Sequence, residues 1–567
     1  MRFLTAAILF VVSAILILTG LAQRTIWHPP AAYVQQLTVA DKAPLIVLKH
    51  SLLTQYPGNP KVTVTGPGKI FIADARQSDI DAWVGQTTRV QLSLSAKSSS
   101  HPALSNLIVG SGKLANPAGS DLWRYETVKS GSASLSINTA EQGAVIIASD
   151  GFQRAPGAIT LTWPIAFDST PSALMIIVGA VILFVALLVN IWAWYNMRKE
   201  RGPRRRIPKA PQGPRMRRRR SKQTAPSRGR RSARNLSVIA GSLALAGILS
   251  GCSGVAVQSP AATGTAAASI QQPPVVTVGQ LGRIVKDIAQ TVAVADASRD
   301  TKVLAGRVTG PALETRQAHY VLQKASKSVG ALPPIASAKI SLALPAATNL
   351  WPRTVMVITS DVGATALPQM LVLQQASPRA QYQLWYNIDM LPGVKLPVVN
   401  TAKVGAIPVA ADSLFLKIAP NALPAAFGDL IDNSQASLSA PMFNVANDEY
   451  YQQIFASQQS QAQTLSNATI KIKHLLGNPT VLSLSTLNSG ALVAVYMNDK
   501  YVIKPKDRTQ AVAVSGNEKL MLGSAGSATG IKSFYGSMLL FYVPSISSKD
   551  KIITLGATQE LLSVKAL

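Results

Sequence analysis

The sequence predicts a multidomain membrane protein in which a β-sandwich outer domain is followed by tandem α+β domains. Three patterns support this class: two long apolar runs, many short segments that alternate apolar and polar residues, and a helix-then-strand order that occurs twice. The chain has 567 residues, which is too long for one ordinary domain. Its mean hydropathy of +0.21 is high for a soluble protein and is consistent with membrane segments.

Two apolar runs are long enough to cross a bilayer as helices. Residues 3–22 contain no charged side chain, and we interpret residues 1–22 as an uncleaved transmembrane helix. A signal peptide that is cleaved after the GLA sequence is the alternative. Residues 172–195 form the second predicted span, which ends in the interfacial aromatic residues Trp192, Trp194 and Tyr195.

A strongly basic segment follows the second span. Residues 197–235 hold 17 basic side chains and one acidic side chain, so they carry +16 of the formal net charge of +29. Basic residues beside a span stay in the cytoplasm, which places residues 23–171 outside the membrane. We expect residues 196–235 to be a disordered cytoplasmic loop in contact with anionic membrane lipids. The loop lacks aromatic residues for base stacking, so we expect no nucleic-acid partner.

A third apolar run, residues 236–250, precedes the only cysteine of the chain, Cys252. The run is short for a membrane crossing but suits the apolar region of an export signal. The sequence LSGC resembles the lipid-attachment box of bacterial lipoproteins, which implies lipidation of Cys252 and cleavage after Gly251. Residues 236–251 are thus a lipoprotein signal or a short third membrane segment. Residues 252–277 are rich in Ala, Gly, Ser and Pro and predict a flexible tether to a domain outside the membrane.

The predicted outer domain, residues 23–171, contains short alternating runs such as KVTVTG, KIFIADA, TRVQLSLS and AITLTW, separated by turn-forming pairs. This regular spacing predicts a β-sandwich. One helical turn is expected at SDIDAWVG, with Ser78 as its N-cap. We expect Trp83 and Trp123 to pack in or near the core. The polar candidates for chemistry, for which structural roles are favoured, are Asp74, Asp79, Asp81, Asp121 and Glu126.

The first part of the chain resembles uncharacterised actinobacterial membrane proteins that carry an RTxWxPP motif after their first span. The motif stands here at residues 24–30, and AWVG at 82–85 and GSDLW at 119–123 add to the resemblance. It covers about residues 1–200 and implies no particular activity.

The second half predicts two α+β units, residues 278–420 and 421–567. Residues 278–325 show helical periodicity, with Pro311 suited to a first helical turn, and four strand-like runs follow. The order then recurs, from the helical AAFGDLIDN and NDEYYQQIFASQQSQA to further strands such as ATIKIKHLL, ALVAVYMN and KYVIK. The apolar positions of the first helix are Leu281, Ile284, Ile288, Val292 and Ala295.

These units resemble the cone-shaped fold of the nuclear transport factor 2 and cystatin-like families. The sequence RVTGPALETRQAHY at residues 307–320 is similar to actinobacterial lipoproteins of this shape. Catalytic members use an Asp–His or Asp–Tyr pair inside the cone. The candidates that the resemblance suggests are Asp287, Asp296, Asp300 and His319, whereas Glu314 and His319 should not face each other on a helix. Three aromatic side chains, Trp351, Trp385 and Tyr386, could line a cleft or pack in the core.

No catalytic motif such as GxSxG, SxxK, a P-loop or GxGxxG occurs with the context that it needs. A single cysteine and five scattered histidines give no metal site, and we expect no cofactor. The sequence therefore predicts a non-enzymatic, membrane-anchored cell-envelope protein with extracytoplasmic binding or scaffold modules. Its expected partners are membrane lipids and an envelope protein or cell-wall component. The alternative is an envelope hydrolase or isomerase with a pocket in residues 278–400, which requires Asp287 or Asp296 within about 3.2 Å of His319.

Overall fold

The computed structural model describes residues 2–27, 32–94, 103–165, 170–200, 272–361, 366–464, 467–507 and 509–567. The chain divides into two compact units. One contains residues 1–29 and 168–270, and the other contains residues 30–167 and 271–567. The first five residues of the predicted basic loop, 196–200, belong to the end of a helix instead. The rest of the loop, the lipid-attachment box at Cys252 and most of the tether fall in residues 201–271, which lie outside the described residues.

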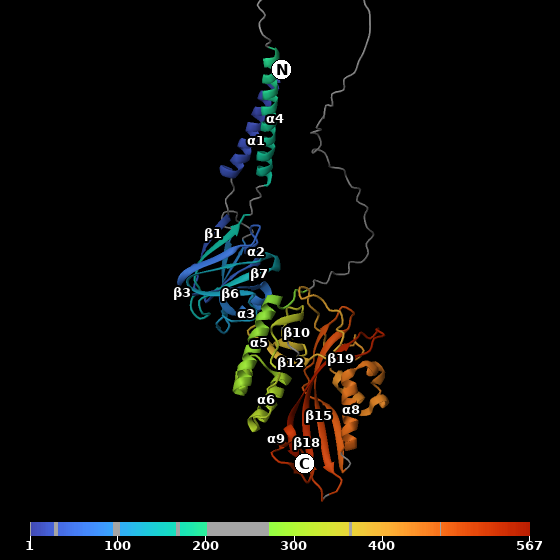
Figure 1. Ribbon diagram of the computed structural model, residues 1–567. Helices are drawn as coiled ribbons and strands as arrows, with labels where there is room; N and C mark the ends of the chain where they lie inside the picture. Colours follow the sequence, from blue (N-terminus) through green and yellow to red (C-terminus); the bar gives the residue numbers. More distant parts are fainter. Residues whose placement is uncertain are drawn as a thin grey trace, which may run out of the picture. The chain divides into compact units, whose positions relative to one another are not determined.

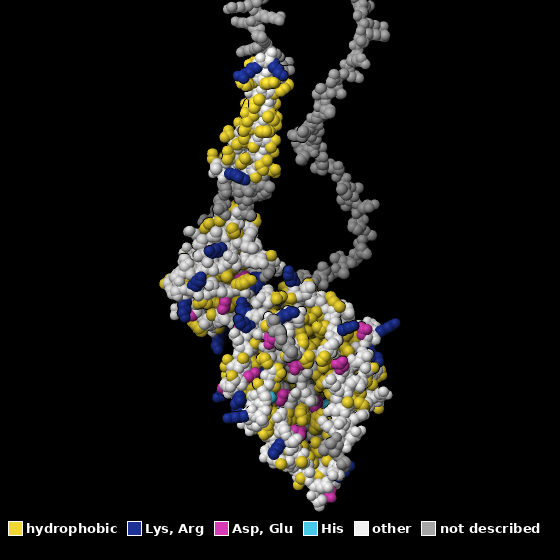
Figure 2. All heavy atoms as spheres, viewed as in Figure 1, with side chains coloured by type: hydrophobic (Ala, Val, Ile, Leu, Met, Phe, Trp, Pro, Cys, Tyr) yellow, Lys and Arg dark blue, Asp and Glu magenta, His cyan; other side chains and the backbone are white. Residues whose placement is uncertain are grey.

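The first unit is built on a pair of apolar helices, α1 (Arg2–Thr25) and α4 (Thr170–Glu200) (Figure 1). Leu4–Thr25 and Ser172–Lys199 are each long and apolar enough to cross a membrane. Arg24 Nε donates a hydrogen bond to Ser172 Oγ at 3.2 Å, so the end of α1 lies beside the start of α4. The surface of the pair is largely hydrophobic and its basic side chains gather at the ends (Figure 2).

Small residues let the two helices approach each other closely. A Cβ atom added at Gly20 would lie 2.7 Å from Cγ1 of Ile176, and one added at Gly179 would lie 2.7 Å from Cγ1 of Ile17. Ser13 Oγ also donates a hydrogen bond to the backbone oxygen of Gly179 at 2.9 Å. Such small-residue contacts are typical of helices that associate in lipid.

Residues 32–164 form a β-rich domain. Its eight strands belong to one nearly closed, barrel-like sheet, where the sequence predicted a β-sandwich. Strand β3 pairs with β8 along its first half and with β7 along its second half, so the sheet curls around its own core. The runs KVTVTG and KIFIADA, which read as two strands in sequence, are both part of β3. The strands are β1 (Ala32–Thr38), β2 (Leu45–Leu48), β3 (Lys61–Arg76), β4 (Thr87–Leu94), β5 (Ala103–Ser111), β6 (Tyr125–Ser136), β7 (Gly143–Ala148) and β8 (Ala158–Pro164).

Both faces of this sheet are buried at its centre. Ile46 and Leu48 of β2 enter one hydrophobic cluster, and the alternate residues Leu45 and Val47 enter a second cluster on the opposite face. This period-2 alternation explains why all four residues of β2 are buried. Two short helices, α2 (His50–Leu53) and α3 (Gln77–Val84), accompany the sheet.

Helix α3 confirms the helical turn expected at SDIDAWVG, but Ser78 is not its N-cap. The helix begins at Gln77, and Arg76, the last residue of β3, takes the capping position with extended backbone geometry. The chain therefore passes directly from strand to helix, and this leaves Ser78 inside the first turn. Its hydroxyl lies 3.4 Å from Oδ1 of Asn349 instead.

The second part of this unit begins with the predicted helices and meander. Thr277 and Gln280 form a capping box at the start of α5, and Pro311 occupies the first turn of α6 as expected. The following four strands pair in sequence order as an antiparallel sheet. The elements are α5 (Val278–Ser298), α6 (Gly310–Ala325), β9 (Lys339–Pro345), β10 (Arg353–Ser360), β11 (Gln369–Gln375) and β12 (Gln383–Asp389).

A second set of helices and strands completes the chain. Strand β15 includes both ALVAVYMN and KYVIK, and β19 is a long strand that we did not expect. One hydrophobic cluster contains residues of both sets, such as Tyr386 and Leu540, and Met390 forms a bridge with Gly556. The elements are α7 (Leu423–Asn433), α8 (Glu449–Thr464), β13 (Ala468–Leu476), β14 (Leu482–Ser485), β15 (Ala491–Pro505), β16 (Val512–Ala513), α9 (Gly516–Leu522), β17 (Gly526–Ser527), β18 (Ile531–Val543) and β19 (Ile553–Ala566).

Candidate functional site

The most distinctive polar feature of the described chain is the surface where residues 271–567 contact the β-rich domain. Four arginines from residues 271–567 point into the β-rich domain, and we call this surface the four-arginine interface. Arg283 lies on α5 and Arg307 lies in the segment before α6. Arg353 is at the start of β10, and Arg379 is in the turn between β11 and β12.

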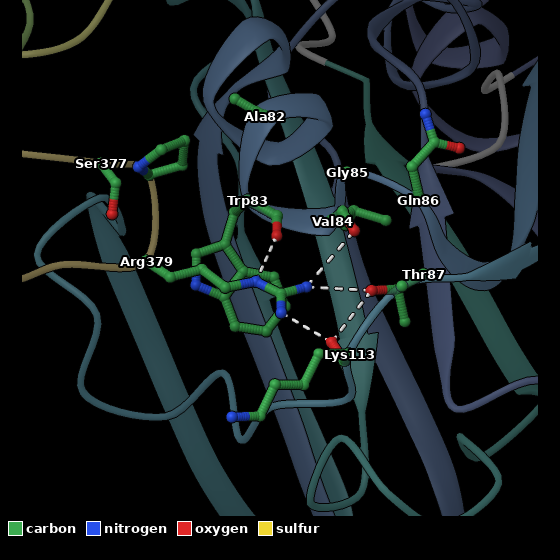
Figure 3. A pocket seen from close by; sticks show the side chains of 11 residues that line it. Ala82, Trp83, Val84, Gly85, Gln86, Thr87, Lys113, Ser377 and Arg379 are labelled. Atoms are coloured by element: carbon green, nitrogen blue, oxygen red, sulfur yellow. Dashed lines mark hydrogen bonds between the residues drawn. The ribbon is translucent and has the colours of Figure 1, made fainter.

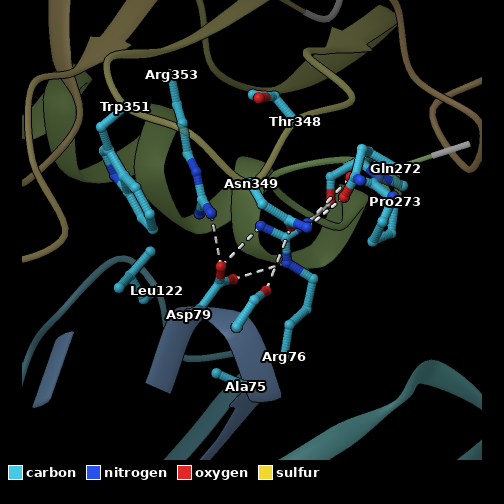
Figure 4. Close-up of polar contacts among 12 residues, drawn as sticks. Ala75, Arg76, Asp79, Leu122, Gln272, Pro273, Thr348, Asn349, Trp351 and Arg353 are labelled. Carbon is cyan, nitrogen blue, oxygen red and sulfur yellow. Dashed lines mark hydrogen bonds and ion pairs between the residues drawn. The ribbon is translucent and has the colours of Figure 1, made fainter. Parts of the chain in front are cut away.

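Asp79 is the centre of the interface (Figure 4). Its Oδ1 accepts hydrogen bonds from Nη2 of Arg353 at 2.7 Å and from Nη2 of Arg76 at 2.7 Å. Its Oδ2 accepts a third, from Nε of Arg76, at 2.8 Å. Asp79 and Arg353 are both buried. This carboxylate is therefore shared by one arginine from each part of the chain.

Trp351, which lies in residues 271–567 like Arg353, packs against the Arg353 guanidinium. The guanidinium carbon of Arg353 lies 3.5 Å from the centre of the Trp351 ring, a distance that allows a cation–π interaction. The same tryptophan packs against the hydrophobic cluster of the β-rich domain that includes Leu122. Burial lowers the pKa of Arg353, while the charge of Asp79 opposes that shift. Trp351 is thus an apolar anchor beside a buried ion pair rather than part of an aromatic cleft.

Asp121 forms the second anionic point of the interface. Its Oδ2 accepts a hydrogen bond from Nη1 of Arg307 at 2.6 Å and another from the backbone nitrogen of Tyr382 at 2.7 Å. Close by, Arg283 Nη2 donates to the backbone oxygen of Trp123 at 2.6 Å. Gln280 Nε2 donates to the backbone oxygen of Leu122 at 3.0 Å. Donors from residues 271–567 therefore bind both a carboxylate and backbone oxygens of the β-rich domain.

Arg379 lines a shallow pocket of about 270 Å³ at this boundary (Figure 3). Its Nε donates to the backbone oxygen of Trp83 at 2.8 Å, its Nη1 to that of Lys113 at 2.6 Å, and its Nη2 to Thr87 Oγ1 at 2.9 Å. Partial burial lowers the pKa of Arg379. The guanidinium lies 4.9 Å from the Trp83 ring centre and fixes the loop around it. The pocket's main cation is thus already engaged by oxygens of the protein.

The comparison with known families assigns the part of the chain that carries these arginines. A family model described as a domain of unknown function, DUF8094, matches residues 272–565, just over half of the chain. The chain belongs to the DUF8094 family. No curated protein matches it. The match includes both helix-and-strand sets but not the β-rich domain, so the interface joins the DUF8094 domain to a part that the family model does not contain.

The other carboxylates proposed from the sequence for the β-rich domain have separate local partners. Asp74 is buried and accepts from Arg124 Nη2 at 2.8 Å. Asp81 lies 3.3 Å from Lys49 Nζ with its side chain 40% exposed, and Glu126 accepts from the backbone nitrogen of Gly119 at 3.0 Å. Each of these three carboxylates thus contacts a different group of the β-rich domain.

Asp296 pairs with arginine and tyrosine in the DUF8094 domain. Its two oxygens each lie 2.7 Å from Nη1 of Arg316, and the Tyr320 hydroxyl donates to its Oδ1 at 2.5 Å. Burial and the adjacent carboxylate both raise the pKa of Tyr320. An Asp–Tyr pair of the type named by the resemblance is therefore present, but Arg316 neutralises its carboxylate.

The remaining candidates in this domain are dispersed. Asp287 lies 3.5 Å from Arg307 Nη2 and its side chain is 47% exposed, while Asp300 accepts from the backbone nitrogen of Lys302 at 2.9 Å. Glu314 adds to the rise in the pKa of Tyr496 that burial causes. Tyr386 donates to the backbone oxygen of Thr480 at 2.6 Å. Trp385 packs on the core, where a Cβ atom at Gly310 would lie 2.8 Å from its ring.

His319 pairs with Glu560 rather than with either aspartate. Its Nδ1 lies 3.0 Å from Oε1 of Glu560 on β19, and its Nε2 lies 2.9 Å from the backbone oxygen of Gly330. Glu560 raises the pKa of His319 above its ordinary value of 6.5, although burial alone would lower it. This contact links α6 to the second set of strands.

We expect this pair to stabilise the fold at low pH. Because the folded-state pKa of His319 is raised, the stabilisation is fully present below about pH 6.5 and is lost as the pH rises through the folded-state pKa. Thermal unfolding of the full chain between about pH 5.5 and 8.5 should show wild type losing stability relative to Glu560→Gln as the pH increases. Parallel curves for the two proteins would contradict the assignment.

Sequence reasoning missed a buried polar network in the sheet that β13, β14, β15, β18 and β19 form. His474 Nδ1 lies 2.6 Å from Oδ1 of Asp499, and Oδ2 of Asp499 accepts from Ser537 Oγ at 2.5 Å and from Gln559 Nε2 at 2.8 Å. The serine hydroxyl thus donates to the aspartate, whereas a nucleophilic serine needs its base, usually histidine, within hydrogen-bond reach. The visible signal was an aspartate in the apolar run ALVAVYMNDKYVI. Within the described residues, no group of three or more His, Cys, Asp or Glu side chains could hold a metal ion.

Proposed function

We propose that this protein is a non-enzymatic, membrane-anchored cell-envelope protein that presents two joined extracytoplasmic modules, the β-rich domain and the DUF8094 domain. The four-arginine interface is the observation that carries the proposal. The candidate carboxylates Asp79 and Asp121, which could have supplied chemistry, instead bind Arg353 and Arg307 and join the two modules. Buried arginines and aromatic anchors are typical of binding surfaces.

The same contacts support a membrane topology with a third crossing. If α1 and α4 both span the bilayer, residues 30–167 lie on one side and the chain beyond Glu200 returns to the other. The DUF8094 domain contacts residues 30–167, so it belongs on their side. The segment between residues 200 and 271 must then cross once more. The apolar run at residues 236–250 is suited to this, as an export signal or as a short third span.

We expect reporter fusions to give an alternating pattern. Fusions at residues 100 and 400 should report the outer side of the membrane, and a fusion at residue 215 should report the cytoplasm, because the arginine-rich segment is retained inside. An alkaline phosphatase and a fluorescent protein reporter at each position provide opposite readouts. A cytoplasmic signal at residue 400 would overturn the third crossing and the lipoprotein assignment together.

We expect diacylglyceryl attachment at Cys252. A fatty-acid probe should label the protein in growing cells, and cleavage after Gly251 should place the label on a fragment of roughly 33 kDa, in proportion to the 59.9 kDa of the 567-residue chain. Cys252→Ala should abolish the label, while the matched variant Ser253→Ala should keep it. Label that persists in Cys252→Ala would disprove lipidation at this residue.

The expected partner of the modules is an envelope protein or cell-wall component, with membrane lipids in contact with the anchors and basic segment. By analogy of fold, the barrel-like sheet of the β-rich domain and the proposed cystatin-like or nuclear-transport-factor-2-like fold favour this role, because such folds often serve as binding or spacing modules. Crosslinking of the full chain in live cells, followed by isolation of the DUF8094 domain, tests it. Recovery of neither an envelope protein nor an envelope polymer would count against it.

The alternative, an envelope hydrolase or isomerase, has one feature in its favour, the contact between Asp296 and Tyr320. Arg316 binds both oxygens of that carboxylate, and His319 is occupied by Glu560 and Gly330. These partners would have to be displaced before either side chain could act on a substrate. We therefore favour the binding and scaffold function.

A further inference from the structure

The β-rich domain and the DUF8094 domain each have their own hydrophobic cores. The clusters around Ile46 and Leu45 are built from residues of the β-rich domain, with Trp351 packed against the second of them. The clusters around Val355 and Phe427 are built from residues of the DUF8094 domain. Within the described ranges, no strand of one domain pairs with a strand of the other. Separate cores without a shared sheet are the property of domains that fold independently.

Most hydrogen bonds between the two domains have their donor on the DUF8094 domain. The DUF8094 side supplies donors, among them the four arginines, and the other side supplies acceptors such as the carboxylates of Asp79 and Asp121. In the reverse direction, Arg76 Nη1 donates to the backbone oxygens of Pro273 at 3.0 Å and Pro274 at 3.2 Å. Arginines placed opposite carboxylates and backbone oxygens at fixed positions give a specific register as well as attraction.

The face of the DUF8094 domain that meets the β-rich domain holds an arginine whose ion-pair partner lies on the other domain. Arg353 is fully buried where the two domains meet, and its Nη2 donates to Oδ1 of Asp79 at 2.7 Å. Trp351 and Arg379 lie at the same boundary. The family model begins at residue 272, beside the two prolines that accept from Arg76, so the family is defined without the β-rich domain. The chain thus joins two separable partners at this point.

From these observations we infer that the β-rich domain is a docking partner of the DUF8094 domain, and that the two remain bound when the chain between them is cut. Covalent continuity through residues 201–270 is not required for the contact. If Cys252 is processed as proposed, the lipidated fragment therefore stays on the membrane-spanning fragment instead of diffusing away. The docking itself does not depend on lipidation.

The test uses the full chain in detergent or lipid nanodiscs. A recognition site for a sequence-specific protease is inserted after residue 262, and the C-terminus carries an affinity tag. After cleavage, we expect residues 1–262 to co-purify with the tagged fragment at about 1 µM, as a micromolar or tighter complex should. Separation of the wild-type fragments under these conditions would overturn the inference.

A variant pair separates specific docking from nonspecific association. The double variant Asp79→Asn/Asp121→Asn keeps side-chain shape but removes both carboxylates, and we expect the cut fragments to bind at least about 100-fold more weakly. The control Asp81→Asn/Asp150→Asn changes two carboxylates away from the interface and should behave as wild type. Equal retention by both variants would also overturn the docking. Because the topology reporters do not depend on this binding, failure of docking and failure of the proposed function give different results.

Discussion

Asp79→Ala is expected to destabilise the contact between the β-rich domain and the DUF8094 domain by about 3–5 kcal/mol, the usual cost of removing one partner of a buried ion pair. The substitution leaves Arg353, which is fully buried, without its carboxylate. It also removes the two carboxylate oxygens that accept from Arg76, which keeps only its contacts with the backbone oxygens of Pro273 and Pro274. The buried charge left at Arg353 accounts for most of the expected loss.

Asp81→Ala provides the matched control, because it changes the same residue type two positions along α3. Asp81 pairs with Lys49 at 3.3 Å, but its side chain is 40% exposed. Exposed pairs contribute about 0–1 kcal/mol. Thermal unfolding followed by tryptophan fluorescence is a suitable measurement because Trp83, Trp123 and Trp351 lie at or near this contact. Equal losses in the two variants would refute the central role of Asp79.

Local periodicity was enough to predict most elements of the DUF8094 domain. The positions Leu281, Ile284, Ile288, Val292 and Ala295 are all buried on α5, as their helical spacing indicated. The four strands after α6 also occur where the alternating runs placed them. These elements can be predicted because each buries a continuous apolar face, and this requires apolar residues at the spacing of a helix or a strand.

Strand boundaries were harder to predict where the sheet bends or ends. Strand β3 contains Gly66, Pro67 and Gly68, which read as a turn, but they fall where the register with β6 shifts between Thr65 and Lys69. Strands β1 and β5 lie at the two ends of the strand order and carry mostly exposed or half-exposed residues. Edge strands need less apolar alternation, so their sequence signal is weak.

The four-arginine interface could not be predicted because it joins residues that are far apart in the chain. Arg353 and Asp79 are separated by 274 positions, and Arg307 and Asp121 by 186. The sequence did single out Asp79 at a helix start, where the helix dipole favours a carboxylate. The dipole accounts for the residue's position on α3, but only the fold provides Arg353 as its partner.

Asp499→Ala is expected to lower the free energy of unfolding of the DUF8094 domain by about 3–5 kcal/mol, because it removes the centre of a buried charged network. Asp499 and its partners His474 and Ser537 are all buried. Its oxygens take part in three hydrogen bonds of 2.5–2.8 Å, which connect β13, β15, β18 and β19. Loss of this one side chain therefore leaves polar groups on three other strands without their partner.

Asp499→Asn should cost less, about 1.5–3 kcal/mol, because it preserves the shape and one acceptor oxygen but loses the charge-assisted hydrogen bonds. The control Asp507→Ala removes an exposed carboxylate just beyond β15 that accepts from the backbone nitrogen of Thr509 at 2.9 Å, and it should have little effect. Denaturant unfolding of the full chain, with hydrogen exchange on β13 and β15, measures all three variants. Since the four strands share one carboxylate, their protection should fall together. A loss confined to one strand, or stability equal to that of the Asp507 control, would show that Asp499 does not hold this sheet together.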